Sequence, residues 1–181
     1  MKRKPWIAFF SQTGSELYQV CESLNIWPDA VVTNAAVVDN SKWQNTSVIH
    51  INKSQKITSD TYFDIFKQYI STGEEAYITL HGWLKIIPKD VCERYTIFNG
   101  HPGDIIKYPE LKGKDPQQKS FDLKLKTSGC IIHRVIAEVD SGPVISRVEC
   151  DISDCKTVEE IIDRLKKISV NMWKEFIKSI I

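Results

Sequence analysis

Tyr95-Thr96-Ile97-Phe98-Asn99-Gly100-His101-Pro102-Gly103 lies just past the middle of the chain, and the rest of the sequence is organised around it. The apolar run from Tyr95 to Phe98 predicts a short buried strand. Because a glycine follows Asn99 and a Pro-Gly pair follows His101, the strand is expected to end in a turn after Phe98. Ligands of open α/β sheets bind outside the carboxyl ends of the strands. The amide of Asn99 and the imidazole of His101 are therefore candidate functional groups.

A second polar insertion in an apolar context, Glu138-Val139-Asp140-Ser141-Gly142-Pro143, follows later in the chain. It adds a carboxylate to the amide and the imidazole. These three groups are sufficient for acyl transfer, because an amide stabilises an oxyanion, an imidazole moves a proton and a carboxylate orients or charges the imidazole. We therefore predict Asn99, His101 and Asp140 as the catalytic residues.

Strands and helices are expected to alternate over most of the chain. Helical periodicity predicts helices over about 17–24, over 58–70 and over about 158–177. This alternation predicts an α/β fold with a Rossmann-like, mostly parallel sheet flanked by helices. The length of 181 residues predicts one domain, 1–181. Besides the central strand, apolar runs predict strands at 5–10, 30–33, 47–51, 76–80, 130–135 and 144–148.

The loop between the first strand and the first helix reads Ser11-Gln12-Thr13-Gly14-Ser15. A helix that begins after such a loop can hold an anion such as phosphate at its N-terminus. One glycine is not a dinucleotide fingerprint, so a serine cap in a tight turn stays open as the alternative. Glu16 is favourable for the helix dipole in the first turn, but its charge repels a phosphate.

Two other segments follow predicted strand ends. The stretch His81-Gly82-Trp83-Leu84-Lys85-Ile86-Ile87-Pro88 has one aromatic and three aliphatic side chains, which either line a crevice for a flat apolar ligand or fill the core. The segment 103–129 is rich in lysine and interrupted by Pro109, Gly113 and Pro116. A long polar segment of this kind is either a lid or binding loop, or a solvated face.

Composition excludes several classes of partner. The 24 basic and 23 acidic side chains nearly cancel, so no nucleic-acid partner is expected. No long apolar run indicates a membrane partner or a secretory signal, and a cytoplasmic location is expected. The five cysteines are scattered, which argues against a disulfide framework. Cys150 and Cys155 lack further ligands at the spacing of a zinc site, so no metal is expected.

Together, these motifs resemble the formyltransferase family that uses 10-formyltetrahydrofolate, which includes glycinamide ribonucleotide transformylase and methionyl-tRNA formyltransferase. The family's catalytic Asn-x-His-Pro is similar to Asn99-Gly100-His101-Pro102, and its Gly-Thr-x-x-His strand is similar to Gly129-Cys130-Ile131-Ile132-His133. Its Val-Asp-x-Gly-Pro-Ile segment resembles Val139-Asp140-Ser141-Gly142-Pro143-Val144. The stretch from Gly82 to Ile87 resembles the Gly-Phe-Met-Arg-Ile-Leu wall of the family's folate pocket. The resemblance covers nearly the whole chain.

The resemblance implies the formyltransferase fold and a one-carbon transferase. Its formyl donor would be 10-formyltetrahydrofolate, and its acceptor the primary amine of a small nucleotide-type molecule, with glycinamide ribonucleotide of purine biosynthesis the best single candidate. The amine attacks the formyl carbon directly and gives a tetrahedral oxyanion. Asn99 donates to that oxygen, His101 stabilises it and moves protons, and Asp140 supports a protonated His101. His133 is left open between a core or second-shell hydrogen-bonding histidine and a catalytic part.

The same resemblance implies two sets of binding residues. The folate is expected against a wall and a turn formed by Trp83, Leu84, Lys85, Ile86, Ile87, Val139, Ser141 and Gly142. The acceptor is expected at the first loop, formed by Ser11, Thr13, Gly14, Ser15 and Glu16.

Departures from the family's pattern keep other functions open. The ribonucleotide transformylase has Gly-Asn-Gly-Ser-Asn where this chain has Gln12-Thr13-Gly14-Ser15-Glu16, so the last Asn is replaced by Glu. The alternatives are transfer to an amino sugar nucleotide or another amine, hydrolysis of the same folate, and folate binding without catalysis. Without the resemblance, a nucleotide-binding α/β protein remains. The protein is expected to be a monomer or a homodimer that binds small molecules.

Overall fold

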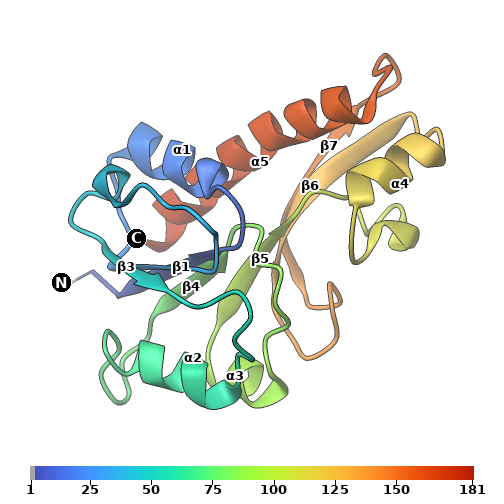
Figure 1. Cartoon of the computed structure of the whole chain (residues 1–181). Helices are drawn as coiled ribbons and strands as arrows, with labels where there is room; N and C mark the ends of the chain where they lie inside the picture. The colour runs from blue at the N-terminus through green and yellow to red at the C-terminus, as the bar shows by residue number, and fades with distance from the viewer. Residues whose placement is uncertain (1–2) are drawn as a thin grey trace.

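Residues 3–181 are described by a computed structural model, in which strands and helices alternate along most of the chain (Figure 1). The strands are β1 (Trp6–Phe10), β2 (Ala30–Thr33), β3 (Ser47–His50), β4 (Tyr77–Leu80), β5 (Ile97–His101), β6 (Thr127–Arg134) and β7 (Val144–Asp151). The helices are α1 (Ser15–Leu24), α2 (Ser59–Phe66), α3 (Lys89–Arg94), α4 (Pro116–Asp122) and α5 (Val158–Ile180), with short 3₁₀ turns η1 (Asn40–Lys42) and η2 (Pro109–Leu111).

All seven strands belong to one sheet, in the spatial order β3-β2-β1-β4-β5-β6-β7. The first five pair in parallel, and β6 and β7 extend the sheet in the antiparallel sense. This confirms the prediction of a mostly parallel α/β sheet. The order reverses between β1 and β4, so the loops that follow these two strands diverge and leave a crevice at their carboxyl ends.

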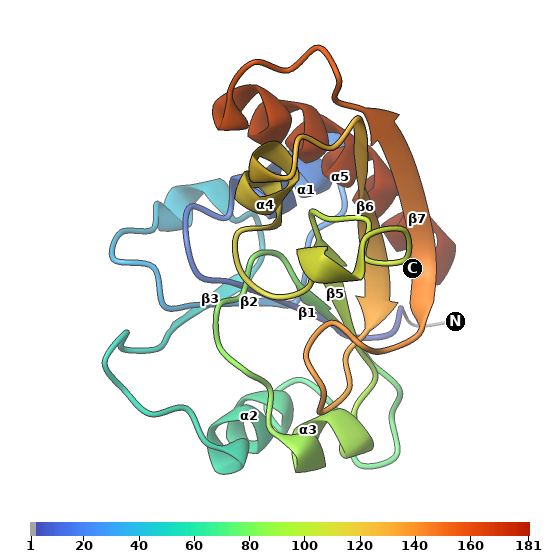
Figure 2. The same cartoon turned by 90° about the vertical axis from the view of Figure 1, so that its right-hand side faces the viewer.

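Helices cover both faces of the sheet (Figures 1 and 2). Successive side chains of a strand point to opposite faces, and β1 shows the consequence. Trp6, Ala8 and Phe10 pack in the core under α1 and α5, whereas Ile7 and Phe9 pack in the core that includes α2 and α3. All five are fully buried. Burial of each large apolar side chain contributes about 1.5–3 kcal/mol to the free energy of unfolding. Strand β1 therefore stabilises the core on both faces of the sheet.

Strand β5 is longer than predicted. It continues through Asn99 and Gly100 to His101, where the sequence indicated a turn after Phe98. The antiparallel neighbour β6 explains the difference, because it pairs His133 with Asn99 and Ile131 with His101. The polar groups therefore lie on a paired strand, which holds them more rigidly than a turn would.

The lysine-rich segment 103–129 is also more ordered than a long loop. It contains η2 and α4, and α4 packs beside α5. Its lysines have specific partners: Lys107 Nζ lies 2.9 Å from Glu149 Oε2, and Lys119 Nζ donates to the carbonyl of Lys112 at 2.6 Å.

The short helix α3 was not predicted either, because six residues are too few to show helical periodicity. Within residues 3–181, no helix is both long and apolar enough to cross a bilayer.

Candidate active site

Asn99 and His101 lie two residues apart on β5, so their side chains share one face of the strand. Gly100 between them faces the opposite side, against α5. A Cβ atom there would lie 2.6 Å from Trp173 Nε1, so a side chain at this position would push the strand away from the helix. The glycine in the Asn-Gly-His motif is therefore required by the packing of α5 on β5.

Asp140 reaches the same place from the loop that joins β6 to β7. Its φ of 51° is left-handed, a conformation that Asp tolerates better than most residues. The base of the loop is closed by Arg134 N, which donates to the carbonyl of Pro143 at 2.9 Å. Gly142 packs directly on the carbonyl oxygen of Arg134, which a Cβ atom would strike. This narrow base turns the carboxylate of Asp140 toward β5 and β6.

Gly142→Ala is expected to destabilise the protein by about 1–3 kcal/mol and to lower turnover, because the added methyl group must open the base of the loop and move Asp140. Chemical denaturation and steady-state rates measure the two effects. Gly73→Ala is the control for turnover: Gly73 has no atoms near its missing Cβ, so the left-handed φ of 81° confines the effect of that substitution to stability. A Gly142→Ala protein as stable and active as wild type would contradict this account of the loop.

The structure places Asp140 between two histidines. Its Oδ2 atom lies 3.3 Å from Nδ1 of His101, and its Oδ1 atom lies 3.3 Å from Nε2 of His133. Nε2 of His133 is also 3.2 Å from the amide nitrogen of Asn99. The predicted catalytic residues thus meet at one point, and His133 joins them through two contacts.

A segment that follows β5 closes over these groups. His101 Nε2 lies 2.8 Å from the carbonyl oxygen of Leu111, and the amide of Gly113 donates to Asp140 Oδ2 at 2.9 Å. Lys112 Nζ lies 2.9 Å from the hydroxyl of Ser141. As a result, His101 and Asp140 are both more than nine-tenths buried.

Burial sets the protonation of the site. It lowers the pKa of His101 below its ordinary value, and the charge of Asp140 only partly offsets this effect. Burial acts to raise the pKa of Asp140, but the polar groups around the carboxylate, the amide of Gly113 among them, outweigh it and hold that pKa below its ordinary value. Near neutral pH, Asp140 is therefore ionised and His101 neutral.

Both ring nitrogens of His101 face hydrogen-bond acceptors, the carbonyl of Leu111 and the carboxylate of Asp140. A neutral imidazole can donate to only one of them, whereas an imidazolium donates to both. The surroundings of His101 therefore become better satisfied when it takes up a proton. Such an arrangement suits a general base, because it stabilises the protonated form of the imidazole.

The segment predicted as the folate wall divides into two sets of side chains. Leu84 is 67% exposed and Ile86 is 74% exposed, so both side chains are accessible in the segment that follows β4. Trp83 and Ile87 are instead buried in the core, where Trp83 Nε1 donates to the hydroxyl of Tyr62 at 3.0 Å. The side chains of Trp83 and Ile87 therefore fill the core, the alternative left open for this segment, and folate binding by the segment stays a prediction. Lys85 is half-buried, and Val139, next to Asp140, is 51% exposed.

The first loop ends at Gly14, whose φ of 65° lets the chain turn into α1. A Cβ atom there would lie 2.8 Å from the ring of Phe10, so the turn packs directly on β1. The amide of Ser15 lies 3.3 Å from the hydroxyl of Thr13. Ser11 Oγ accepts a hydrogen bond of 2.8 Å from the amide of Leu84. This bond joins the loop that follows β1 to the loop that follows β4.

Glu16 does not stand as an isolated charge in this loop. Its Oε1 atom lies 3.2 Å from Nδ1 of His81, whose other ring nitrogen is 3.0 Å from the hydroxyl of Thr79. Burial acts to raise the pKa of Glu16. His81, Ser169 and Lys166 outweigh that effect and hold the pKa below its ordinary value. The carboxylate is therefore ionised, but its charge is compensated by its neighbours.

Sequence reasoning missed His81 and Lys166. Lys166, on α5, donates from Nζ to the hydroxyl of Ser15 at 2.9 Å and so brings a cation to the N-terminus of α1. Nothing in the sequence relates residues so far apart. His81 could have been found, because it directly follows the buried strand β4, as Asn99 and His101 follow the buried part of β5.

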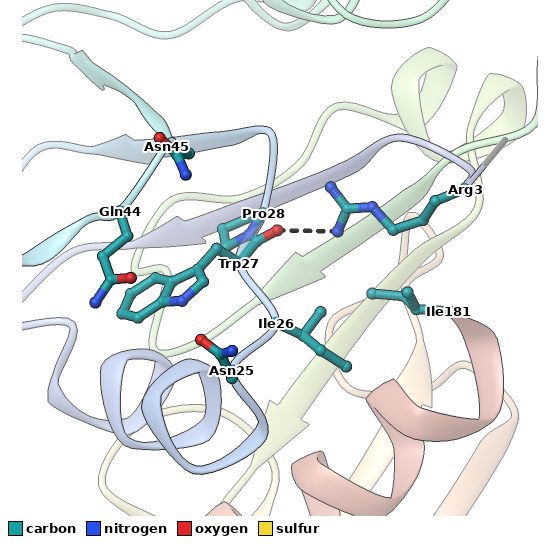
Figure 3. Close-up of a pocket in the computed structure, with 8 residues that line it drawn as sticks. All are labelled: Arg3, Asn25, Ile26, Trp27, Pro28, Gln44, Asn45 and Ile181. Carbon is teal, nitrogen blue, oxygen red and sulfur yellow. Dashed lines mark hydrogen bonds between the residues drawn. The ribbon is translucent and has the colours of Figure 1, made fainter.

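A separate hollow of about 360 Å³ lies at the opposite edge of the sheet, where the parallel strands begin (Figure 3). Its charged group, Arg3, is already engaged with the carbonyl of Trp27 at 2.9 Å and with Asp29 at 3.0 Å. Among residues 3–181, no other charged side chain lines it. The remaining lining residues are Asn25, Ile26, Pro28, Gln44, Asn45 and Ile181.

An open, mostly parallel sheet with an amide, two imidazoles and a carboxylate at its carboxyl edge defines an α/β protein with an acid–base site. Residues 6–177 match the family described as formyl transferase. The chain belongs to this family, which confirms the resemblance carried by its motifs.

Curated relatives include two activities. The chain is 33% identical over 122 residues to the phosphoribosylglycinamide formyltransferase of Dictyostelium discoideum, which covers 63% of this chain and 58% of that protein. It is 30% identical over 94 residues to the methionyl-tRNA formyltransferase of Thermotoga neapolitana, covering 52% of this chain and 28% of that protein. The matched part thus spans less than two thirds of either relative.

Solved structures share the fold. The phosphoribosylglycinamide formyltransferase of Anaplasma phagocytophilum aligns with a TM-score of 0.82 at 18% identity, over 96% of this chain and 84% of that one. A formyltetrahydrofolate deformylase of Pseudomonas putida aligns with a TM-score of 0.75 at 18% identity, over 94% of this chain and 62% of that one. At these identities the likeness concerns the fold alone.

Proposed function

We propose that this protein transfers the formyl group of 10-formyltetrahydrofolate to the primary amine of a small phosphate-bearing acceptor, with glycinamide ribonucleotide as the best candidate. The observation that carries the proposal is the convergence of Asn99, His101 and Asp140 at the carboxyl edge of the sheet. The names of relatives such as the Dictyostelium discoideum enzyme support the same acceptor.

Each of the three side chains has a role in this reaction. Asn99 Nδ2 uses one N–H for His133, which leaves its second N–H for the formyl oxygen as that atom gains negative charge. Neutral His101 accepts a proton released by the attacking amine, and Asp140 stabilises the resulting imidazolium. As the bond between the formyl carbon and the folate nitrogen breaks, His101 returns the proton to that nitrogen, and tetrahydrofolate leaves. Because these groups are buried, each interaction acts in a medium of low dielectric constant and is stronger than it would be in water.

Side chains beside the catalytic residues suit a folate. Leu84 and Ile86, which follow β4, and Val139, which precedes Asp140, expose apolar surface that a flat heterocycle can cover. Ser141 and Gly142 follow directly in the turn, where their backbone groups can meet the polar edge of the ring. When bound, 10-formyltetrahydrofolate supplies the formyl group.

The N-terminus of α1 suits a phosphate. Its cap, Gly14, has no side chain, and Lys166 lies beside Ser15 in the first turn. Glu16 is tied to His81, and its charge is compensated by Lys166, so the acidic residue in this loop is compatible with a phosphate. An amino sugar nucleotide also carries phosphate, so the experiment must compare the two acceptors.

Single-turnover formyl transfer from 10-formyltetrahydrofolate, followed by absorbance, tests the proposal. Glycinamide ribonucleotide and then an amino sugar nucleotide serve as acceptors, and a third reaction omits the acceptor. Rapid transfer to the ribonucleotide is expected. Transfer only to the sugar nucleotide would identify that molecule, in place of glycinamide ribonucleotide, as the acceptor. Release of formate without any acceptor would show a hydrolase. Folate binding without turnover would show a binding module.

Lys166→Met is expected to raise the KM of a phosphate-bearing acceptor by about 10–100-fold, since a hydrogen bond to a charged group is worth about 1.5–3 kcal/mol. The KM of the folate should stay unchanged. Lys167→Met is the matched control, because Lys167 is the next residue of α5 and is exposed. Equal effects of the two substitutions, or a shift in the KM of the folate instead, would remove Lys166 from the acceptor site.

A further inference from the structure

His133 meets two partners with opposite requirements at one ring nitrogen. Its Nε2 atom lies 3.2 Å from Nδ2 of Asn99 and 3.3 Å from Oδ1 of Asp140. An amide nitrogen can only donate a hydrogen bond, and an ionised carboxylate can only accept one. Nε2 therefore accepts from Asn99 when it carries no proton, and donates to Asp140 when it carries one.

The other ring nitrogen indicates which state is present. Nδ1 of His133 lies 3.0 Å from the carbonyl oxygen of Arg134, which can only accept, so Nδ1 carries a proton. Of the two neighbours of Nε2, only Asn99 Nδ2 lies in hydrogen-bond geometry with it, whereas Oδ1 of Asp140 is an ion-pair contact at 3.3 Å. A neutral ring with its proton on Nδ1 therefore matches the contacts.

We propose that His133 is a positioning residue that fixes the amide of Asn99, an inference that rests on the proposed formyl transfer. In its Nδ1–H form it accepts from Asn99 Nδ2 and so holds the amide with its second N–H available to the reacting oxygen. A proton on Nε2 would remove this acceptor and attract Asp140. The amide would then be free to turn its oxygen into the site, where an oxyanion would be repelled.

The tautomer is tested directly by ¹⁵N NMR of the histidine-labelled full-length protein without substrates. We expect His133 to show a protonated Nδ1 and an unprotonated Nε2 near neutral pH, and the spectrum of His133→Gln assigns its signals. A protonated Nε2 would overturn the inference. This measurement does not depend on whether the protein transfers formyl groups.

Kinetics test the consequence. His133→Phe, which removes the acceptor, should lower kcat by about tenfold or more with both KM values within about threefold. His133→Gln, whose oxygen can accept from Asn99, should retain more activity than His133→Phe. His50→Gln, at an exposed histidine of β3, is the matched control. Active wild type with unchanged kcat in both variants would refute the role of His133 alone, whereas inactive wild type would refute the proposed function.

Discussion

Replacing Asp140 by Asn is expected to lower the turnover number of formyl transfer by about 10²–10⁴-fold, the range of general acid–base catalysis. Asn adopts the left-handed conformation at this position as readily as Asp does, and its oxygen can still accept from the amide of Gly113. The substitution therefore removes a charge and leaves the loop in place. Folate binding, measured by fluorescence titration, should be nearly unchanged.

The pH profile of the Asp140→Asn protein should also shift in a defined direction. The charge of Asp140 raises the pKa of His101 against the effect of burial, so its loss lowers that pKa further. The acid inflection of kcat/KM should therefore move to lower pH while the plateau falls. Asp115→Asn is the matched control, because Asp115 is also left-handed, with a φ of 54°, and is exposed. Turnover of Asp140→Asn within about threefold of wild type would exclude Asp140 from the chemistry.

Replacing Asn99 by Ala is expected to lower kcat by about 10²–10³-fold, the cost of removing one oxyanion donor. The donor acts on charge that develops during the reaction, so the KM of the folate should change by less than about threefold. The substitution leaves β5 paired with β6, because that pairing uses backbone groups. Thermal unfolding should therefore show a stable protein.

Asn171→Ala is the control for the loss of the Asn99 amide, since Asn171 is an exposed asparagine on α5. An Asn99→Ala protein with nearly normal kcat and a raised KM would mean that the amide binds substrate without acting on the transition state. In that case the oxyanion would have to be stabilised by another donor, and the role assigned to Asn99 would be wrong.

Local sequence patterns were sufficient for most of the architecture. A strand or a long helix shows its buried face in its own periodicity. The buried run from Trp6 to Phe10 and the helical stripe of α5 could therefore be recognised directly. Their alternation with other strands and helices predicted a mostly parallel α/β sheet. The patterns also placed Asn99, His101 and Asp140 near strand ends, where polar residues interrupt apolar runs. Three motifs in order then indicated the family.

Side-chain direction could not be read from the sequence in irregular segments. Trp83 and Leu84 are adjacent and both apolar, yet one is buried under β1 and the other is exposed. Which of them faces the core depends on how the segment after β4 packs on Phe9, whose ring centre lies 5.3 Å from that of Trp83. The extra length of β5 likewise depends on a strand that comes thirty residues later.

Only the tertiary structure decided which distant groups meet. The sequence determined that an amide, an imidazole and a carboxylate occur at strand ends, since each is marked by its immediate neighbours. It did not determine that Asp140 lies between His101 and His133, that His81 compensates Glu16, or that Lys166 reaches Ser15. Those contacts arise because the sheet and the helices packed on it bring the ends of separate strands together, and no local pattern encodes that distance.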